Sequence, residues 1–466
     1  MEIADHYDVI LVGGGPATRI LNKYLHVLQP GIRTLVIRDE ERIVNHCGTP
    51  YIVEGRIEWE RGLIAEELVT RFGTPILVDP VVGGDPRRKE VETASGRRIG
   101  YDRLVFATGT DQVLPPLPGI ESDRVLKVRR TEDLRRTMAR LRDAGSAVVL
   151  GAGYIGIEFA VALRNMGKRV TVIELADHVM GGRIDEQMAV AIEEHLRGLG
   201  IDVRPGRRAT CIEESGGACA VEIDGGDRVA ADVVLPAVGV RPLVDYAPAF
   251  GLTTTPNGIV VDEYFRTGVP DIWAIGDCIE TRSRITGRPV PGKLGSNAGQ
   301  MARRLGLNMA GIATPFPGVV NAAVTMIEGL GYGGAGLSEA DADREGIPVL
   351  VTRNTSTSCY ENMPDPRPVE TKLVFDARTL RLLGGEILGR FNPAGFVEVI
   401  AQMVEREATL EDVLTMTYSS HPELTPKTSK PFLAWAAEPL LRSLAGQGRL
   451  ELLRSARGTE TDRARE

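Results

Sequence analysis

Two stretches of the chain share one pattern of hydrophobic and polar positions. Residues 8–15 read DVILVGGG and residues 147–156 read AVVLGAGYIG, so each is an apolar run that ends in or runs into glycines. A helix-like stretch follows in both copies, and then a second apolar run, RTLVIRDE in the first and RVTVIELAD in the second. This order predicts a strand, a glycine-rich turn, a helix and a strand, which is the arrangement of a dinucleotide-binding unit.

The second copy has every feature of that unit. Gly151 permits the tight turn, Gly153 lets the backbone approach a pyrophosphate, and Gly156 lets the helix pack against the strand. The N-terminus of the helix then offers unpaired N–H groups to the phosphates. Glu174 ends the second strand, where a carboxylate accepts hydrogen bonds from ribose hydroxyls and repels a 2′-phosphate. The sequence therefore predicts NADH in preference to NADPH, the alternative being a glycine turn that only packs.

The first copy is less regular. Its turn runs from Gly13 through Gly15 to Pro16, but Thr18 stands where a third glycine or alanine is usual. We therefore expect the helix and the strand to pack slightly farther apart in this copy.

The acid that contacts the ribose is displaced in the first copy, and either Asp39 or Glu40 can serve. Each copy also has a later apolar strand that ends in glycine. The first reads LVFATG and includes Thr108 and Gly109, and the second reads VLPAVG and ends at Gly239. Two units of similar size and order indicate a duplication.

Composition limits the possible functions. A chain of 466 residues is too long for one hydrophobic core, and its net charge of −8 does not favour a nucleic-acid partner. No segment approaches the roughly 20 apolar residues that span a bilayer, and the acidic N-terminus is unlike a signal peptide. Five scattered cysteines do not suggest a disulfide framework, so we expect a reducing, cytoplasmic location, and no metal site is predicted.

In combination these motifs resemble the pyridine nucleotide–disulfide oxidoreductases, which carry FAD in one domain and NAD(P)H in the next. The resemblance extends from about residue 7 to about residue 436. It includes ATGTDQVLPPLPGI after the first unit, GIVVDEYFRTGVPDIWAIGDCIE after the second, and a C-terminal segment from about residue 322. The resemblance implies that Asp277 hydrogen-bonds the ribityl chain of FAD and that Gly276 allows a close approach of the backbone.

The resemblance also implies an α/β fold with two doubly wound dinucleotide-binding domains, for FAD and NAD, and a C-terminal α+β dimerisation domain. We expect residues 1–117 and 253–318 to form a split FAD domain and residues 118–252 to form the NAD domain. Residues 322–440 would form the dimerisation domain of a homodimer, and residues 441–466 a charged tail whose end is disordered.

Cys47 lies in NHCGTPYIVEG, which resembles the single-cysteine branch of the family, with a site that reads roughly Ser-x-x-x-Cys-Gly-x-Pro-Tyr. This branch includes coenzyme A-disulfide reductases, polysulfide and persulfide reductases, and NADH oxidases and peroxidases. Pro50 and Ile52 stand where other branches have a second cysteine, so a local disulfide is excluded. A helix N-terminus and oxidised flavin nearby would lower the pKa of the lone thiol. The alternative is a small buried hydrophobic residue.

The C-terminal segment contains candidate acids. Tyr360 in CYENMPDPRP and Tyr418 in TYSSHPELTP resemble the two tyrosines of coenzyme A-disulfide reductases, the second of which comes from the partner subunit. His421 precedes a proline, as does the acid–base histidine of glutathione and lipoamide enzymes. We hypothesise that Tyr418 or His421 protonates the leaving thiolate across a dimer interface. Glu158 has a family counterpart at the nicotinamide, or is an exposed helix acid.

We therefore expect an FAD-dependent enzyme that uses NADH and Cys47 to reduce a small disulfide, persulfide or polysulfide. The oxidases and peroxidases of the family often have a histidine in the first glycine loop, where this chain has Pro16 and Ala17. Arg19 and Lys23 on the first helix are candidates for binding coenzyme A. The alternatives are an NADH oxidase or peroxidase that cycles a sulfenic acid, a reductase of a protein electron carrier, and a non-catalytic nucleotide-binding or redox-sensing protein.

Overall fold

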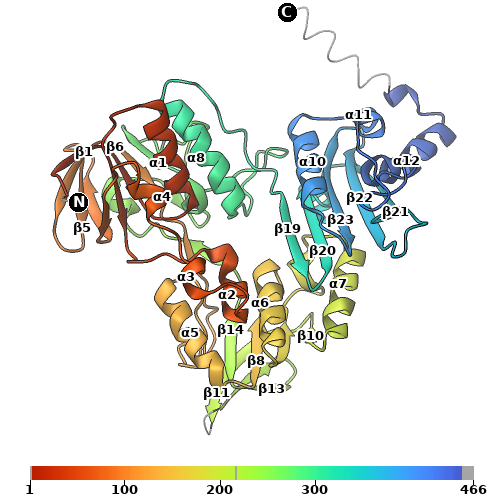
Figure 1. The fold of residues 1–466 in the computed structure, drawn as a ribbon, viewed down its shortest axis with the longest axis horizontal. Coiled ribbons are helices and arrows are strands. Elements are labelled where there is room, and N and C mark those ends of the chain that lie inside the picture. Colours follow the sequence, from red (N-terminus) through yellow and green to blue (C-terminus); the bar gives the residue numbers. More distant parts are fainter. Residues whose placement is uncertain (1–2, 216–217, 454–466) are drawn as a thin grey trace, which may run out of the picture.

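The computed structural model describes residues 3–215 and 218–453. Three lobes make up the molecule, and Figure 1 shows them side by side. The N-terminal residues and α8 form one lobe, the middle of the chain forms the second, and the C-terminal third forms the last. The final residues of the expected tail, 454–466, lie outside the described part of the chain.

A seven-stranded sheet organises the first lobe. Its elements come from both sides of the second lobe in the sequence. They are β1 (His6–Val12), α1 (Pro16–Leu28), β2 (Thr34–Arg38), η1 (His46–Gly48), α2 (Thr49–Glu54), α3 (Trp59–Gly62), α4 (Glu67–Thr70), β3 (Ile76–Val78), β4 (Val81–Asp85), β5 (Glu90–Thr93), β6 (Arg98–Phe106), β16 (Thr254–Thr255), β17 (Gly258–Ile259), β18 (Ile272–Ala274), η4 (Gly276–Cys278) and α8 (Gly295–Met309).

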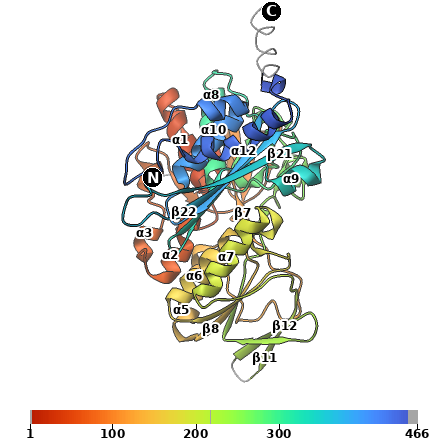
Figure 2. The same cartoon turned by 90° about the vertical axis from the view of Figure 1, so that its right-hand side faces the viewer.

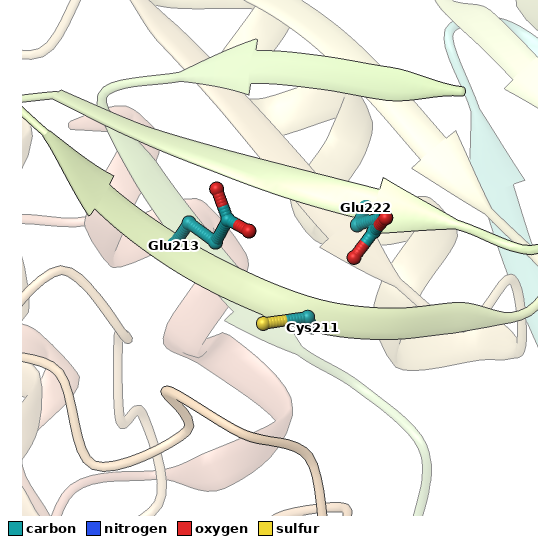
Figure 3. A group of neighbouring side chains, drawn as sticks. All are labelled: Cys211, Glu213 and Glu222. Atoms are coloured by element: carbon teal, nitrogen blue, oxygen red, sulfur yellow. The ribbon is translucent and has the colours of Figure 1, made fainter. Parts of the chain in front are cut away.

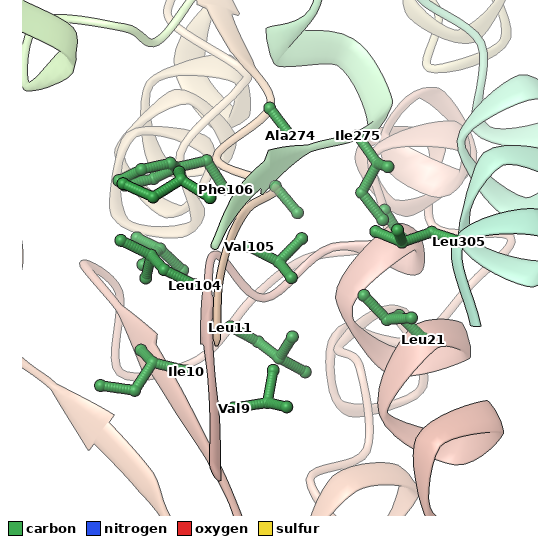
Figure 4. Close-up of a cluster of buried hydrophobic side chains, with 14 of the residues drawn as sticks. Val9, Ile10, Leu11, Leu21, Leu104, Val105, Phe106, Ala274, Ile275 and Leu305 are labelled. Atoms are coloured by element: carbon green, nitrogen blue, oxygen red, sulfur yellow. The ribbon is translucent and has the colours of Figure 1, made fainter. Parts of the chain in front are cut away.

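Strand β1 lies between β2 and β6 and is parallel to both, while β4 and β5 extend the sheet as an antiparallel meander. Strand β18 pairs in parallel with β6, so the chain returns to the first sheet after it has formed the second lobe. Figure 4 shows the core that results, in which Leu11 and Val105 of the sheet face Leu21 of α1 and Leu305 of α8. All four side chains are buried, and this packing fixes the start of α1 at the end of β1.

The second lobe repeats the parallel arrangement on a smaller scale. A parallel sheet of order β10-β9-β8-β14 is joined by an antiparallel sheet of β11, β12 and β13, and β15 pairs with β7 of the connecting segment. The elements are β7 (Thr110–Gln112), α5 (Thr131–Asp143), β8 (Ser146–Leu150), α6 (Tyr154–Asn165), β9 (Arg169–Ile173), η2 (Val179–Gly182), α7 (Glu186–Gly198), β10 (Asp202–Arg204), β11 (Ala209–Ser215), β12 (Ala218–Ile223), β13 (Arg228–Ala231), β14 (Val233–Pro236), β15 (Val240–Pro242) and η3 (Ala247–Phe250).

The third lobe is an antiparallel sheet of order β19-β20-β23-β22-β21 with helices packed on it. Helix α12 continues through Gly446, so the first six residues of the expected charged tail belong to this helix. The elements are β19 (Ala323–Ile327), β20 (Leu330–Gly336), α9 (Glu339–Glu345), β21 (Val349–Thr357), β22 (Pro368–Asp376), β23 (Leu382–Gly389), α10 (Ala394–Glu405), α11 (Leu410–Thr415) and α12 (Phe432–Gly446).

The second and third lobes share a hydrophobic core. Ile327, Tyr332 and Leu388 of the third lobe belong to the same buried cluster as Ile157 and Phe159 of α6. Figure 2 shows the third lobe lying across the end of the second, above α6 and α7. The observed architecture confirms the predicted α/β class with two dinucleotide-binding units and a C-terminal α+β domain. Within the described residues, every helix is too short or too polar to cross a membrane.

Candidate active site

One cavity of about 2440 Å³ opens between the three lobes. Both glycine turns and the predicted cysteine contribute to its wall. The sequence-predicted residues that line it are Gly13, Gly15, Pro16, Asp39, Glu40, Cys47, Thr108, Gly109, Gly151, Gly153, Glu158, Glu174, Gly239, Gly276 and Asp277. The cavity therefore gathers residues that are far apart in the sequence, from Gly13 to Asp277.

The first glycine turn leaves the N-terminus of α1 open. Gly15 is the N-cap of α1 and Pro16 begins the helix, with no side chain capping the first N–H groups. A Cβ atom on Gly15 would meet nothing within 4 Å, whereas a Cβ on Gly13 would lie 2.2 Å from the carbonyl oxygen of Ala107. Thr18 is fully buried, and its hydroxyl has no hydrogen-bond partner in the described structure. Unpaired N–H groups at such a terminus bind phosphate.

The two candidate ribose acids of the first unit both contact the start of α5. Asp39 forms an ion pair with Arg130 at 2.8 Å, and Glu40 Oε2 accepts a hydrogen bond from the Thr131 N–H at 2.7 Å. Burial raises the pKa of Glu40, against the opposing effect of the Thr131 hydrogen bonds. Each carboxylate also lines the cavity, so the choice between them stays a prediction.

The second glycine turn is packed more tightly. A Cβ atom on Gly151 would lie 2.7 Å from the Ala237 carbonyl oxygen, and one on Gly156 would lie 2.0 Å from the Gly151 carbonyl oxygen. Gly156 is buried and does not line the cavity, so its position suits a packing role. Gly153, the N-cap of α6, has nothing within 4 Å of a Cβ position and leaves this helix terminus open as well.

Glu174 is fixed beside the second turn by two backbone donors. Its carboxylate accepts hydrogen bonds from the N–H of Ala152 at 2.6 Å and from the N–H of Ala176 at 2.8 Å. The carboxylate lines the cavity next to the open start of α6. An acid held in this position can accept from ribose hydroxyls, which is the role that the sequence predicts.

Cys47 lies in η1, directly before α2, and its side chain is exposed to the cavity. Its Sγ lies 4.0 Å from the position that a Cβ on Gly295 would take, so the thiol is close to the start of α8. In the protein alone the pKa of the Cys47 thiol is raised by burial and by Glu158, against the opposing effect of Arg129. In the protein alone, the direction of this shift is therefore opposite to the lowered pKa that the sequence predicts for the thiol.

Glu158 is half-buried in the cavity wall and is not an exposed helix acid. Its Oε1 accepts a hydrogen bond from the Thr325 hydroxyl of β19 at 2.9 Å, which ties α6 to the third lobe. Burial raises the pKa of Glu158, against the opposing effect of this hydrogen bond. The carboxylate acts electrostatically on Cys47, so the two residues face the same part of the cavity.

Arg129 is a site residue that the sequence analysis missed. Its guanidinium donates to the backbone oxygen of Thr110 at 3.0 Å and to the Thr110 hydroxyl at 2.7 Å, and it lies 3.8 Å from Asp277. It lines the cavity and favours the thiolate form of Cys47. A signal was present in the sequence. Arg129 and Arg130 directly precede a helix, where the helix dipole disfavours positive charge, so each arginine needs an acidic or carbonyl partner elsewhere.

Gly276 and Asp277 belong to η4, which packs beside the first turn of α1. A Cβ on Gly276, which has a φ of 78°, would lie 3.3 Å from the Ala17 Cβ. Burial raises the pKa of Asp277, while Arg129 and Lys293 lower it. These carboxylate and backbone groups stand beside the open end of α1 in the cavity.

The predicted acids of the C-terminal segment lie outside the cavity of their own chain. The Tyr360 hydroxyl is 2.8 Å from the Ser420 hydroxyl, and the Tyr418 hydroxyl donates to the Thr428 carbonyl oxygen at 2.7 Å. His421 is exposed on the same pair of loops. The structure therefore brings these residues together with one another but not with Cys47.

The remaining cysteines are all free and are not among the residues that line the cavity, with Cys219, Cys278 and Cys359 buried, and Cys278 lies directly behind the wall next to Asp277. Cys211 is near Glu213 and Glu222 on β11 and β12, as Figure 3 shows. The possible ligand atoms of these three residues lie within 4.8 Å of one another, and Glu213 also forms an ion pair with Arg228 of β13. Cys47 is the cysteine that lines the cavity between the two glycine turns.

Comparison with known families assigns the chain. The family described as pyridine nucleotide-disulphide oxidoreductase matches residues 7–302, and the dimerisation domain of that family matches residues 322–430. The chain belongs to the pyridine nucleotide-disulphide oxidoreductase family, which confirms the resemblance seen in its motifs. Members of this family are enzymes that use FAD and NAD(P)H.

Individual relatives extend the similarity over nearly the whole chain. An NADH oxidase of Methanocaldococcus jannaschii is 28% identical over 449 residues, covering 94% of this chain and 99% of the relative. An NAD(P)H coenzyme A polysulfide/persulfide reductase of Pyrococcus horikoshii is 29% identical over 390 residues, covering 82% and 87%. The solved NAD-dependent persulfide reductase of A. fulgidus superimposes with a TM-score of 0.89 at 27% identity, covering 94% of this chain and 83% of that one.

The residues present fit the two cofactors of the family. The open start of α1, with Asp39 and Glu40 at the end of β2 and Asp277 close by, offers the N–H donors and carboxylates that suit the diphosphate, ribose and ribityl groups of FAD. The open start of α6 and Glu174 offer the same groups to NAD(P)H.

Proposed function

We propose that this protein is an NADH-dependent reductase of a small disulfide, persulfide or polysulfide, and that it acts through FAD and Cys47. The observation that carries the proposal is the position of one thiol in the cavity wall between two open helix termini. Two proteins with sulfur-reductase names are among its relatives, which supports the same chemistry.

The chemistry needs one thiol and two electrons. The Cys47 thiolate attacks one sulfur of the disulfide RSSR, forms a mixed disulfide with that half, and releases the other half as a thiolate. FAD, when bound, carries two electrons from NADH to this mixed disulfide. The Cys47 thiolate is thereby regenerated and the second thiol is released, so that NADH, a proton and RSSR give NAD⁺ and two RSH. Arg129 favours the thiolate form of Cys47, whereas burial and Glu158 disfavour it.

The acid that protonates the released thiolate is proposed to come from a partner subunit. Tyr418 and His421 lie on exposed loops outside the cavity, and the chain contains a dimerisation domain. A homodimer would place these loops at the cavity of the other subunit. Mixed dimers of Cys47→Ser chains with chains that lack both Tyr418 and His421 test this arrangement, because only a trans arrangement restores one complete site.

Coenzyme A is the favoured carrier of the substrate sulfur. Arg19 of α1 lines the cavity, and its Nε is buried without a hydrogen-bond partner in the described structure, so it is available to a phosphate-bearing ligand. Lys23 is exposed one turn further on and does not line the cavity. A relative that is named as a coenzyme A polysulfide/persulfide reductase supports this choice.

The rival function is an NADH oxidase or peroxidase, and a relative with the name NADH oxidase supports it. In that cycle, peroxide oxidises the Cys47 thiolate to a sulfenic acid and leaves as hydroxide, and the sulfenic acid then takes two electrons and a proton and returns to thiolate and water. Oxygen would first have to be reduced to peroxide by two electrons from NADH. Pro16 and Ala17 stand in the first glycine loop where that branch of the family often has a histidine, which favours the sulfur substrates.

The test is anaerobic NADH consumption by the FAD-loaded protein with coenzyme A disulfide and with polysulfide. We expect turnover in the wild type, none in Cys47→Ser, and normal turnover in the matched control Cys211→Ser, whose thiol is remote from the cavity. Turnover that is equal in Cys47→Ser and the wild type would point to a protein electron carrier as the acceptor. Consumption of NADH only with oxygen or peroxide would establish the oxidase.

A further inference from the structure

A chain of polar side chains connects the second glycine turn to the third lobe. Tyr154 is the first residue of α6 and lines the cavity beside Gly153 and Glu158. Its ring centroid lies 6.3 Å from that of Tyr332 in β20, so the two aromatic side chains lie next to each other. The Tyr332 hydroxyl in turn donates to Glu386 Oε1 in β23 at 2.8 Å. Among residues 3–215 and 218–453, no such row of tyrosine and glutamate side chains meets the first glycine turn.

The third lobe provides a fitted pocket for the Glu386 carboxylate. Gly334 pairs with Glu386 across β20 and β23, and a Cβ on this glycine would lie 3.3 Å both from the Glu386 Cγ and from the Tyr332 hydroxyl oxygen. The backbone N–H of Asp185 donates to both carboxylate oxygens, at 3.0 and 3.3 Å. Tyr332 and Glu386 are 2% and 4% exposed, so neither is oriented by solvent.

The surroundings of Glu386 bring the pKa of its carboxyl group close to neutral pH. Lys372 is buried but already pairs with Asp185 and, at 2.7 Å, with Glu339. Burial raises the pKa of Glu386 to about 7, against the opposing effects of Tyr332, the Asp185 N–H and Lys372. Burial also raises the pKa of each tyrosine, so both phenols stay neutral. The titratable and charged groups nearby are Tyr332 (β20), Lys372 and Glu370 (β22), Asp185 (before α7), Tyr154 and Glu158 (α6), Glu339 (α9), Arg183 and Arg353.

The protonation of Glu386 fixes the direction of the hydrogen bonds. An ionised carboxylate only accepts, so Tyr332 donates to it and its oxygen is left able to accept from the neighbouring Tyr154. A protonated carboxyl group donates to Tyr332, whose own proton then turns toward Tyr154. The Tyr154 O–H is released toward the cavity in that second state, and the side chain is no longer held by a charge-assisted chain.

We propose that Tyr332 and Glu386 are positioning residues for the pyridine nucleotide: they act through Tyr154, at the start of the helix that receives the nucleotide, and set how tightly NADH binds. Binding is tighter when Glu386 is protonated and the Tyr154 hydroxyl is free for the ligand. The inference rests on the use of NAD(P)H by the family and is independent of the sulfur substrate and of Cys47.

The test is equilibrium binding of tetrahydro-NADH, which has the neutral ring of NADH but cannot donate hydride, to the oxidised FAD-loaded protein. We expect the affinity of the wild type to fall by about fivefold, the worth of one hydrogen bond, as pH rises through the Glu386 transition. Glu386→Gln cannot change charge, so its affinity should stay constant over this range. Glu370→Gln on β22 removes a neighbouring acid that does not contact Tyr332, and it should keep the wild-type profile.

An infrared difference spectrum across the same pH range gives a second readout without any nucleotide. In the wild type, a protonated-carboxyl band should disappear as the pH is raised. The same pH-dependent band should be seen in Tyr332→Phe, and it should be absent from Glu386→Gln. Tyr332→Phe keeps the ring but cuts the chain, so its binding should lose the pH dependence although Glu386 still titrates. The proposal is overturned if either Glu386→Gln or Tyr332→Phe retains the wild-type binding profile, or if Glu370→Gln also loses it. Should Glu386→Gln fail to fold, Tyr332→Phe alone decides the question.

Discussion

The two glycine turns of this chain reach the same backbone geometry with different packing. Gly15 and Gly153, the N-caps of α1 and α6, have φ values of −73° and −75° and ψ values of −172° and −176°. Behind them, the first unit buries Thr18, whereas a Cβ on Gly156 in the second would lie 2.0 Å from a backbone oxygen. The two turns therefore share the open N-cap glycine, which is the part that can face a phosphate. The third position, Thr18 in one turn and Gly156 in the other, determines only how closely the helix packs against the strand.

The units also differ in what surrounds the nucleotide site. The acids of the first unit are engaged with the start of α5, while Glu174 of the second is held by two backbone N–H groups. The second unit is in contact with the third lobe through Glu158 and Tyr154.

Exchanging the third residue of each turn should break the comparison with the largest effect. Gly156→Thr pushes a side chain into the Gly151 carbonyl oxygen, so we expect a loss of about 3 kcal/mol in the free energy of unfolding and of most NADH-dependent flavin reduction. Thr18→Gly removes a side chain that has room, and the loss should be about 1 kcal/mol. Urea unfolding of the two FAD-loaded variants measures the free energies of unfolding, and anaerobic flavin reduction by NADH measures the loss of activity. Equal losses of unfolding free energy in Gly156→Thr and Thr18→Gly would contradict the difference in packing.

Removing the charge of Glu174 tests the choice of nucleotide. Glu174→Gln should lower the ratio of kcat/KM for NADH over that for NADPH by about tenfold, because a charge-assisted hydrogen bond and a repulsion are both lost. Glu158→Gln, on α6 of the same dinucleotide-binding unit but hydrogen-bonded to Thr325 of the third lobe, is the matched control and should leave this ratio unchanged. An unchanged ratio in Glu174→Gln would show that another group selects the nucleotide.

The groups around Cys47 should shift its titration in opposite directions. Burial and Glu158 raise the thiol pKa and Arg129 lowers it, so the pH midpoint for alkylation of Cys47 should fall in Glu158→Gln and rise in Arg129→Gln, each by about one pH unit or less. Thiolate reactivity is gained as pH rises through this pKa. Rates of iodoacetamide labelling against pH give the midpoints, and shifts of the same sign in both variants would refute the assignment.

The smallest effect concerns the hydroxyl of Thr18, which is buried without a partner in the described structure. Thr18→Val keeps the shape and removes this unsatisfied group, so the FAD-loaded protein should be stabilised by about 1 kcal/mol. The change in urea midpoint measures this gain. A loss of stability of the same size would show that bound FAD or the backbone accepts a hydrogen bond from Thr18.

The local parts of the site could be predicted from the sequence, because each is encoded in a short run of residues. Gly13 to Pro16, Gly151 to Gly156 and Glu174 lie where strand ends, turns and helix starts place them, in one cavity or directly behind it. The predicted family and fold class are confirmed for the same reason. The α12 boundary was missed because the charged segment after residue 440 still has a buried Leu444 on its inner face.

The long-range parts could not be predicted. Arg129 meets Asp277, and Tyr332 and Glu386 meet Tyr154, only because three lobes converge, and no periodic pattern records such contacts. Asp39 and Glu40 stand side by side in the sequence, and only the fold shows that Asp39 is exposed and pairs with Arg130 while Glu40 is half-buried against Thr131. Tyr360, Tyr418 and His421 lie outside their own cavity, and their proposed role depends on a second chain.

The central claim is that Cys47 holds half of the substrate during turnover. The most direct measurement is the mass of peptides from FAD-loaded protein that has reacted once with coenzyme A disulfide and been quenched in acid without reducing agent. We predict one coenzyme A joined by a disulfide to the peptide that contains Cys47, and its loss when NADH is added before the quench. Unmodified Cys47, or coenzyme A on another cysteine, would contradict the account.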